Sequence, residues 1–180
     1  LSLESHERVG IIAPSGFGKT TFCKILAGYE KPDSGEVLLD GKPLSSYKGY
    51  CPVQMIWQHP EQVVNPRLHL KKVLEEGDGI DERIIRGLGI EDDWLNRYPG
   101  ELSGGELQRF SILRALNPKT KFIIADEIST MLDAVPQVQI WESLLSVARK
   151  NKVGVLVVSH DKNLLNRICD KIIYLADITD

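Results

Sequence analysis

The chain has 180 residues, of which 42% are hydrophobic and 26% charged, a composition typical of a globular protein rather than of a disordered tail or a fibre. Its formal net charge of −3 gives no electrostatic argument for nucleic acid, and no apolar run approaches the roughly 20 residues that cross a bilayer. The three cysteines are widely spaced and in no CxxC pattern, which favours reduced cytosolic thiols over disulfides or a zinc site.

The first third of the chain alternates apolar runs with one helical pattern. The elements predicted there, in chain order, are a strand at 8–13, a helix at 20–29, two antiparallel strands within 35–44 and a strand at 52–58. Asp40 and Gly41 form the turn expected between the antiparallel strands. This part therefore predicts a buried strand followed by a helix, and a small antiparallel arm.

The remainder begins with a mostly helical stretch, which we interpret as a helical subdomain at 61–117 inserted into one domain that covers 1–180. The elements predicted after it are a strand at 121–126, a helix at 138–150, a strand at 153–160 and a last strand near the sheet edge at 171–177. Continuous apolar strands that alternate with helices indicate an α/β fold with a mainly parallel central sheet.

The segment APSGFGKTT, residues 13–21, follows a predicted strand and opens a predicted helix. That is the context of a phosphate-binding loop, in which backbone N–H groups and the positive helix end surround a polyphosphate. The usual pattern begins with glycine, whereas here it begins with Ala13, which is costly only if its φ is positive. The residues expected to bind nucleotide are Ser15, Gly16, Phe17, Gly18, Lys19, Thr20 and Thr21, with the Thr20 hydroxyl also a ligand of Mg²⁺.

Two further strand ends carry polar side chains. Asp126 is the last residue of the strand at 121–126 and Glu127 follows it directly, while His160 is the last residue of the strand at 153–160. Ligands of open parallel sheets bind beyond the carboxyl ends of the strands, so these residues are expected beside the phosphate-binding loop. Asp126 suits Mg²⁺, Glu127 suits the role of general base for an attacking water, and His160 suits contact with the γ-phosphate. Taken singly, each also fits a bland role, as a helix cap or a structural histidine.

Gln58 ends the strand at 52–58 and can reach the same edge. A neutral amide can bind Mg²⁺ or a water without adding charge, so Gln58 is a candidate for both nucleotide and metal binding. A solvent-facing glutamine in a loop is the simpler interpretation of this residue alone.

The stretch LSGGELQR, residues 102–109, predicts a helix start with an unusual composition. Ser103 and Glu106 fit a capping box, yet Gly104 and Gly105 in the first turn each cost about 1 kcal/mol relative to alanine. A plain capping box with incidental glycines is one interpretation of this stretch.

Together these segments resemble the nucleotide-binding domain of ABC ATPases, which are P-loop NTPases. APSGFGKTT is similar to the Walker A loop, FIIADE to the Walker B strand, LSGGELQR to the signature motif, Gln58 to the Q-loop, Asp133 to the D-loop and His160 to the switch histidine. The resemblance runs from Leu1 to about Ala176, with all motifs in the order of the family.

The resemblance implies ATP and Mg²⁺ as cofactors, with Glu127 and His160 catalytic. It also implies that the glycine-rich helix start binds the nucleotide of a second ABC ATPase subunit, an identical copy or a paralogue, because glycines let backbone N–H groups approach a phosphate closely. The nucleotide-binding residues that the resemblance implies beyond the loop at 13–21 and Gln58 are Ser103, Gly104, Gly105, Glu106 and Asp133. ATP would then drive dimerisation, and hydrolysis would release the dimer.

A finer resemblance lies in residues 55–67, where the Q-loop is followed by Asn65-Pro66-Arg67 as in the peptide and nickel importer branch. It implies a peripheral subunit at the cytoplasmic face of the membrane, bound to integral membrane transport subunits and working with a substrate-binding protein. No nucleic acid is expected. A non-transport ABC ATPase acting on DNA or ribosomes is the alternative, and a P-loop nucleotide kinase is a third hypothesis that leaves LSGGE unexplained.

The sequence departs from the family in one respect that affects the adenine base. Members usually carry an aromatic residue well before Walker A, whereas the first aromatic here is Phe17. Either the chain is a trimmed form, or adenine binding relies on another group.

Overall fold

The computed structural model describes residues 1–75, 82–130, 132 and 134–178. They form two compact units, each described by itself below. Unit 1 comprises Leu1–Met55, Lys119–Glu127 and Val153–Asp180, and unit 2 comprises Ile56–Pro118 and Ile128–Lys152.

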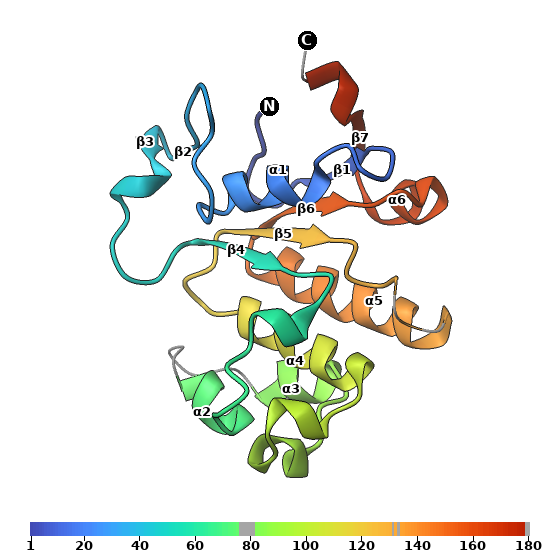
Figure 1. Ribbon diagram of the computed structural model, residues 1–180. Coiled ribbons are helices and arrows are strands. Elements are labelled where there is room, and N and C mark those ends of the chain that lie inside the picture. The colour runs from blue at the N-terminus through green and yellow to red at the C-terminus, as the bar shows by residue number, and fades with distance from the viewer. Residues whose placement is uncertain (76–81, 131, 133, 179–180) are drawn as a thin grey trace. The chain divides into compact units, whose positions relative to one another are not determined.

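Unit 1 is built on a five-stranded sheet with the order β4-β5-β6-β1-β7 (Figure 1). Its strands are β1 (Arg8–Ile12), β4 (Val53–Ile56), β5 (Phe122–Asp126), β6 (Gly154–Val158) and β7 (Lys171–Tyr174). β1 runs parallel to β6 and β7, and β5 runs parallel to β6. Every residue of β6 is buried, which explains its continuous apolar run. The predicted α/β fold with a parallel sheet is confirmed, and β7 lies at the sheet edge as expected.

The predicted antiparallel arm is also present, as β2 (Leu38–Leu39) and β3 (Lys42–Pro43). Asp40 and Gly41 have φ of 52° and 73°, and positive φ at both central positions is what a tight two-residue hairpin turn requires. The Asp-Gly pair therefore determines where the hairpin turns.

Helix α1 (Lys19–Leu26) follows β1 and is shorter than predicted. Gly28 has φ 77° and its N–H bonds to the carbonyl of Ile25 at 3.0 Å. A left-handed glycine just past the last turn ends a helix, so residues 27–29 lie outside α1.

Helix α6 (Lys162–Ile168) was not predicted. Asp161 caps it, because its Oδ1 accepts hydrogen bonds from the N–H groups of Asn163 and Leu164 at 2.9 and 3.1 Å. The aspartate before a short helical run was a usable signal for this helix.

Unit 2 contains α2 (Leu70–Glu75), α3 (Glu82–Gly87), α4 (Gly104–Ala115) and α5 (Ala134–Lys150). As predicted, the described residues of 61–117 form helices and turns without a strand. The core of unit 2 includes the fully buried Phe110 of α4 and Leu144 of α5. Among the described helices, none has the length and apolarity needed to traverse a membrane.

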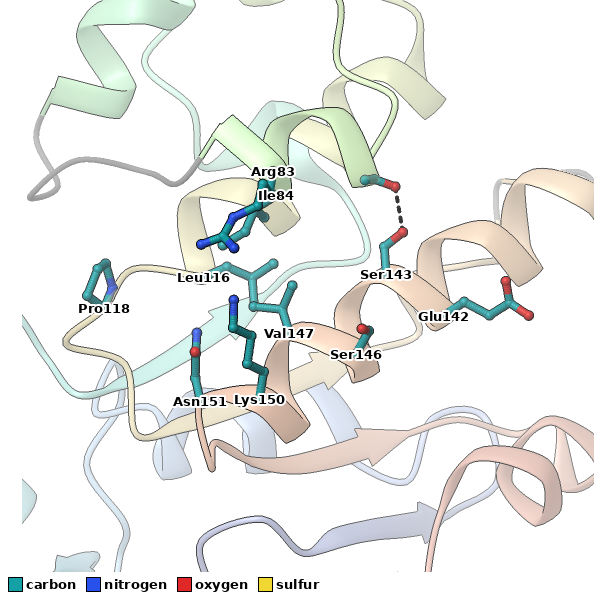
Figure 2. Close-up of a pocket in the computed structure, with 11 residues that line it drawn as sticks. Arg83, Ile84, Leu116, Pro118, Glu142, Ser143, Ser146, Val147, Lys150 and Asn151 are labelled. Carbon is teal, nitrogen blue, oxygen red and sulfur yellow. Dashed lines mark hydrogen bonds between the residues drawn. The ribbon is translucent and has the colours of Figure 1, made fainter.

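Unit 2 also holds an open cavity of about 720 Å³ next to α3 and α5 (Figure 2). The Ser143 hydroxyl donates to the Gly87 carbonyl at 2.6 Å beside it, and exposed side chains such as Glu142 and Lys150 line it. None of the nucleotide-site residues predicted from the sequence lines this cavity.

Candidate nucleotide-binding site

The loop that joins β1 to α1 has the backbone of a phosphate cradle. Gly16 and Gly18 have φ of 80° and 79°, and a Cβ built on either would meet nothing within 4 Å. These positions need glycine for conformation, and they leave the backbone open to a ligand. Ala13 is buried and has no positive φ, so the departure from the usual first glycine costs no left-handed strain.

Lys19 lies at the start of α1 with its side chain buried. Its Nζ donates to the carbonyls of Ala13 and Pro14 at 3.1 and 3.2 Å, and it forms an ion pair with Glu127 Oε1 at 3.3 Å. A buried ammonium needs such partners. The amides of the first turn of α1 have no acceptor inside the helix, so a cation and free helix amides lie beside one loop.

Asp126 is the last residue of β5 and is 1% exposed. The Thr20 hydroxyl donates to its Oδ2 at 2.8 Å, whereas Oδ1 is buried without a hydrogen-bond partner among the described residues. Burial raises the pKa of Asp126 above its ordinary value, and the neighbouring charge of Glu127 acts in the same direction. An unsatisfied buried carboxylate oxygen is costly and suits a position where a cation binds.

The raised pKa of Asp126 predicts how stability depends on pH. The protonated form is favoured in the folded state, so its stabilising contribution is complete below the ordinary pKa of 3.8 and is lost as pH rises through the higher folded pKa. Asp126→Asn removes this loss. At neutral pH and without nucleotide or metal, the variant is expected to melt at a higher temperature than the wild type.

Thermal melts between pH 4 and 8 check this expectation, and the difference between the two proteins should shrink toward acid pH. Asp92→Asn is the matched control, because Asp92 is an exposed acid in unit 2. An Asp126→Asn variant that melts below the wild type at neutral pH would contradict the prediction.

Glu127 and His160 meet at the ends of β5 and β6. The parallel register puts Asp126 opposite Val158, and the Glu127 N–H bonds to the Val158 carbonyl at 3.0 Å. Glu127 Oε2 then lies 2.8 Å from His160 Nδ1. Glu127 has φ 49°, a left-handed conformation that is uncommon for a residue other than glycine and is concentrated at functional sites.

The predicted meeting of three strand ends is therefore observed in unit 1. The loop after β1, the acids after β5 and the imidazole after β6 are joined by the contacts of Lys19 and His160 with Glu127 and of Thr20 with Asp126. Ser15, Phe17 and Thr21 are exposed in or just after the same loop.

The donor set fits Mg²⁺ bound together with phosphate. In the described part of the chain, no group of three or more His, Cys, Asp or Glu side chains could hold a metal by itself. Mg²⁺ commonly uses one or two carboxylates and completes its shell with substrate phosphates and water. Asp126 with its unpartnered oxygen, and the adjacent Thr20 hydroxyl, match that requirement.

The glycine-rich helix start lies in unit 2 and has the predicted capping box. Ser103 Oγ accepts from the Glu106 N–H at 3.3 Å, and Glu106 Oε2 accepts from the Ser103 N–H at 2.6 Å. The hydrogen bonds from Ser103 lower the pKa of Glu106. Gly104 is exposed, and a Cβ there would meet nothing within 4 Å, whereas one at Gly105 would approach the Leu132 side chain at 3.1 Å. Packing within the protein therefore does not require a glycine at position 104.

Gln58 also belongs to unit 2, where its Nε2 donates to Thr130 Oγ1 at 3.4 Å. Asp133 lies outside the described residues. Gln108 was not among the predicted residues; it is buried in α4 and donates through Nε2 to the carbonyl of Trp57 at 3.2 Å. A glutamine among the apolar positions of that helix was the only available signal.

The fold and the strand-end geometry of unit 1 define a P-loop nucleotide-binding domain of the ATPase class. Residues 1–130 match the family model described as ABC transporter. The chain therefore belongs to the ABC transporter family.

Relatives of the family are similar over nearly the whole chain. The dipeptide transport ATP-binding protein DppF of Lactococcus lactis subsp. cremoris is 35% identical over 96% of this chain, and the chain spans 62% of that protein. The nickel import ATP-binding protein NikE of Rhodospirillum rubrum is 31% identical over 98% of this chain, which spans 70% of it.

A solved structure of an ATP-binding cassette has a fold similar to that of this chain. It is the dimeric, post-hydrolysis state of the ATP-binding cassette MJ0796 bound to ADP and Pi. Its TM-score is 0.82 at 26% identity, with 97% of this chain and 83% of that chain covered.

Proposed function

We propose that this chain binds and hydrolyses ATP as a subunit of an ABC transporter that imports peptide, nickel or a related small solute. The observation that carries the proposal is the contact series Lys19–Glu127–His160 beside the Thr20–Asp126 hydrogen bond. The solute class is supported by the names of the relatives, which are a dipeptide transport and a nickel import protein.

In this proposal the loop binds ATP through charge and backbone donors. The open backbone at Gly16 and Gly18 and the first-turn amides of α1 surround the phosphates, while Lys19 exchanges its carbonyl contacts for the β- and γ-phosphates. Thr20 and Asp126 hold Mg²⁺. The ion, when bound, neutralises charge that develops on the phosphate oxygens.

Hydrolysis needs a base beside the γ-phosphate, and Glu127 is the proposed base. Its two oxygens are divided between Lys19 and His160 at 3.3 and 2.8 Å, so its carboxylate is oriented by two neighbours. His160 is the proposed positioning partner, because it holds one carboxylate oxygen while the other faces Lys19. Glu127 then accepts the proton of the attacking water.

The second half of each site is proposed to come from another ABC ATPase subunit, an identical copy or a paralogue. Ser103, Gly104, Gly105 and Glu106 of one chain would bind the nucleotide held by Lys19 of the other, with Asp133 at the contact and Gln58 as a ligand of Mg²⁺ or water. The exposed, side-chain-free Gly104 supports this role. We also propose that residues 1–180 form one ABC ATPase domain, into which the helical subdomain at 61–117 is inserted.

The whole assembly is proposed to lie at the cytoplasmic face of the membrane, with integral membrane subunits and a substrate-binding protein. The test is affinity purification of the tagged full chain from its native membranes, followed by identification of co-purified proteins. Transport subunits that span the membrane are expected in constant proportion to the chain. A chain that instead stays free of membranes and co-sediments with ribosomes or DNA would refute the proposal.

A further inference from the structure

Helix α4 is attached to the chain segment that carries Gln58. The side chain of Gln108 is 4% exposed, and its Nε2 donates to the carbonyl of Trp57 at 3.2 Å. Trp57 immediately precedes Gln58. A buried amide donor must be hydrogen-bonded to offset its desolvation, so this contact fixes the main chain next to Gln58.

A second contact holds the other end of the same segment. The guanidinium of Arg114, also on α4, donates to the carbonyl of Val63 at 3.2 Å. Between the two carbonyls lies a short 3₁₀ turn, Pro60–Gln62, which itself packs against α4. The segment 57–63 is thus attached to one helix at both ends.

The same helix begins with the glycine-rich turn. Ser103 caps α4 through its hydrogen bond with Glu106, and Gln108 lies in the following turn. A continuous helix of 12 residues is a stiff element. Displacement of Gln58 and of the Ser103 end relative to each other would therefore break the Gln108 hydrogen bond.

We propose that Gln108, with Arg114 in support, is a positioning residue that makes segment 57–63 and α4 move as one element. This inference rests on the proposed function, in which Gln58 and the Ser103–Glu106 turn both bind nucleotide. A displacement of Gln58 on ATP binding would then displace the Ser103–Glu106 turn as well, because no flexible segment separates them. Gln108 itself touches no substrate; it keeps these two nucleotide-binding segments in a fixed relative position.

The variant that tests the inference is Gln108→Met, which keeps the length of the side chain and removes its donor. The matched control is Gln54→Met, because the Gln54 amide likewise donates to a main-chain carbonyl, that of Cys51, at 2.7 Å in unit 1. The acceptor of this bond, Cys51, lies outside segment 57–63.

Two measurements are made on the full chain. In Gln108→Met, hydrogen exchange of the free protein should accelerate together in residues 57–63 and 103–107, while Gln54→Met leaves both segments unchanged. ATP turnover should fall about tenfold, as for the loss of one hydrogen bond in the reacting state, with the Kd for ATP unchanged.

Arg114→Met provides an independent variant if Gln108→Met does not fold, and the same joint acceleration is expected. Unchanged exchange in 57–63 overturns the inference, as does acceleration in 57–63 with 103–107 unaffected. A loss of turnover that is matched by a loss of ATP affinity also overturns it. If the wild-type chain does not hydrolyse ATP, the proposed function fails, and the exchange experiment still decides the coupling.

Discussion

In the Glu127→Gln variant, ATP turnover is expected to fall by about 10²–10⁴-fold, the range that a general base contributes, while ATP binding persists. The amide keeps the shape of the side chain and its contact with His160 Nδ1, but it cannot accept a proton from water. The ATP-bound form should accumulate, and under the proposed scheme it should accumulate as a dimer. Phosphate release measures the turnover, and size-exclusion chromatography with light scattering measures the molar mass of the ATP-bound form, both in the presence of ATP and Mg²⁺.

The control for this variant is Glu142→Gln, which changes an exposed acid of α5 in unit 2 and should leave turnover at the wild-type value. A Glu127→Gln protein that hydrolyses ATP at the wild-type rate would falsify the assignment of the base. One that stays monomeric with saturating ATP and Mg²⁺ would count against the two-subunit site while leaving the base intact.

Replacement of Lys19 by methionine is expected to weaken ATP binding about 10–100-fold, as for the loss of hydrogen bonds to a charged group. Methionine fills the buried space of the lysine stem but supplies neither the charge nor the N–H donors that bind phosphate in the proposed function. Titration calorimetry with ATP and Mg²⁺ measures the affinity directly.

Lys24→Met is the matched control, because Lys24 lies on the same helix, is partly exposed and pairs with Glu30 at 3.2 Å. Equal losses of affinity in the two variants would mean that Lys19 acts only through the net charge of α1. A Lys19→Met variant with the wild-type Kd would remove the loop from the binding site.

The elements of the fold were largely predictable, whereas their order in the sheet was not. Apolar runs marked β1, β5 and β6, and the Asp-Gly pair marked the hairpin, because these signals are local. The sequence does not reveal that β6 lies between β5 and β1. Buried parallel strands are all continuous apolar runs, so their residues do not indicate which strands are neighbours. Helix α6 was missed although Asp161 signals its start.

The candidate site, like the fold, was predictable only in part. The strand-end rule predicted that Lys19, Glu127 and His160 would meet, because each follows a strand of a parallel sheet. Gln108 could not be assigned a partner, since its acceptor is a main-chain carbonyl 51 positions away and carbonyls leave no pattern in a sequence. The left-handed φ of Glu127 was likewise not predicted, because a glutamate carries no local signal for a positive φ.

The contacts of Lys19 have a consequence for how a nucleotide enters. The ammonium contacts both the two carbonyls at the start of its own loop and the carboxylate of Glu127. These contacts within the protein hold the loop in its conformation without a ligand. In the proposed function, arrival of a polyphosphate is therefore an exchange of partners rather than the ordering of a flexible segment, which lowers the ordering cost of association. The same exchange would separate the Glu127 carboxylate from the Lys19 ammonium.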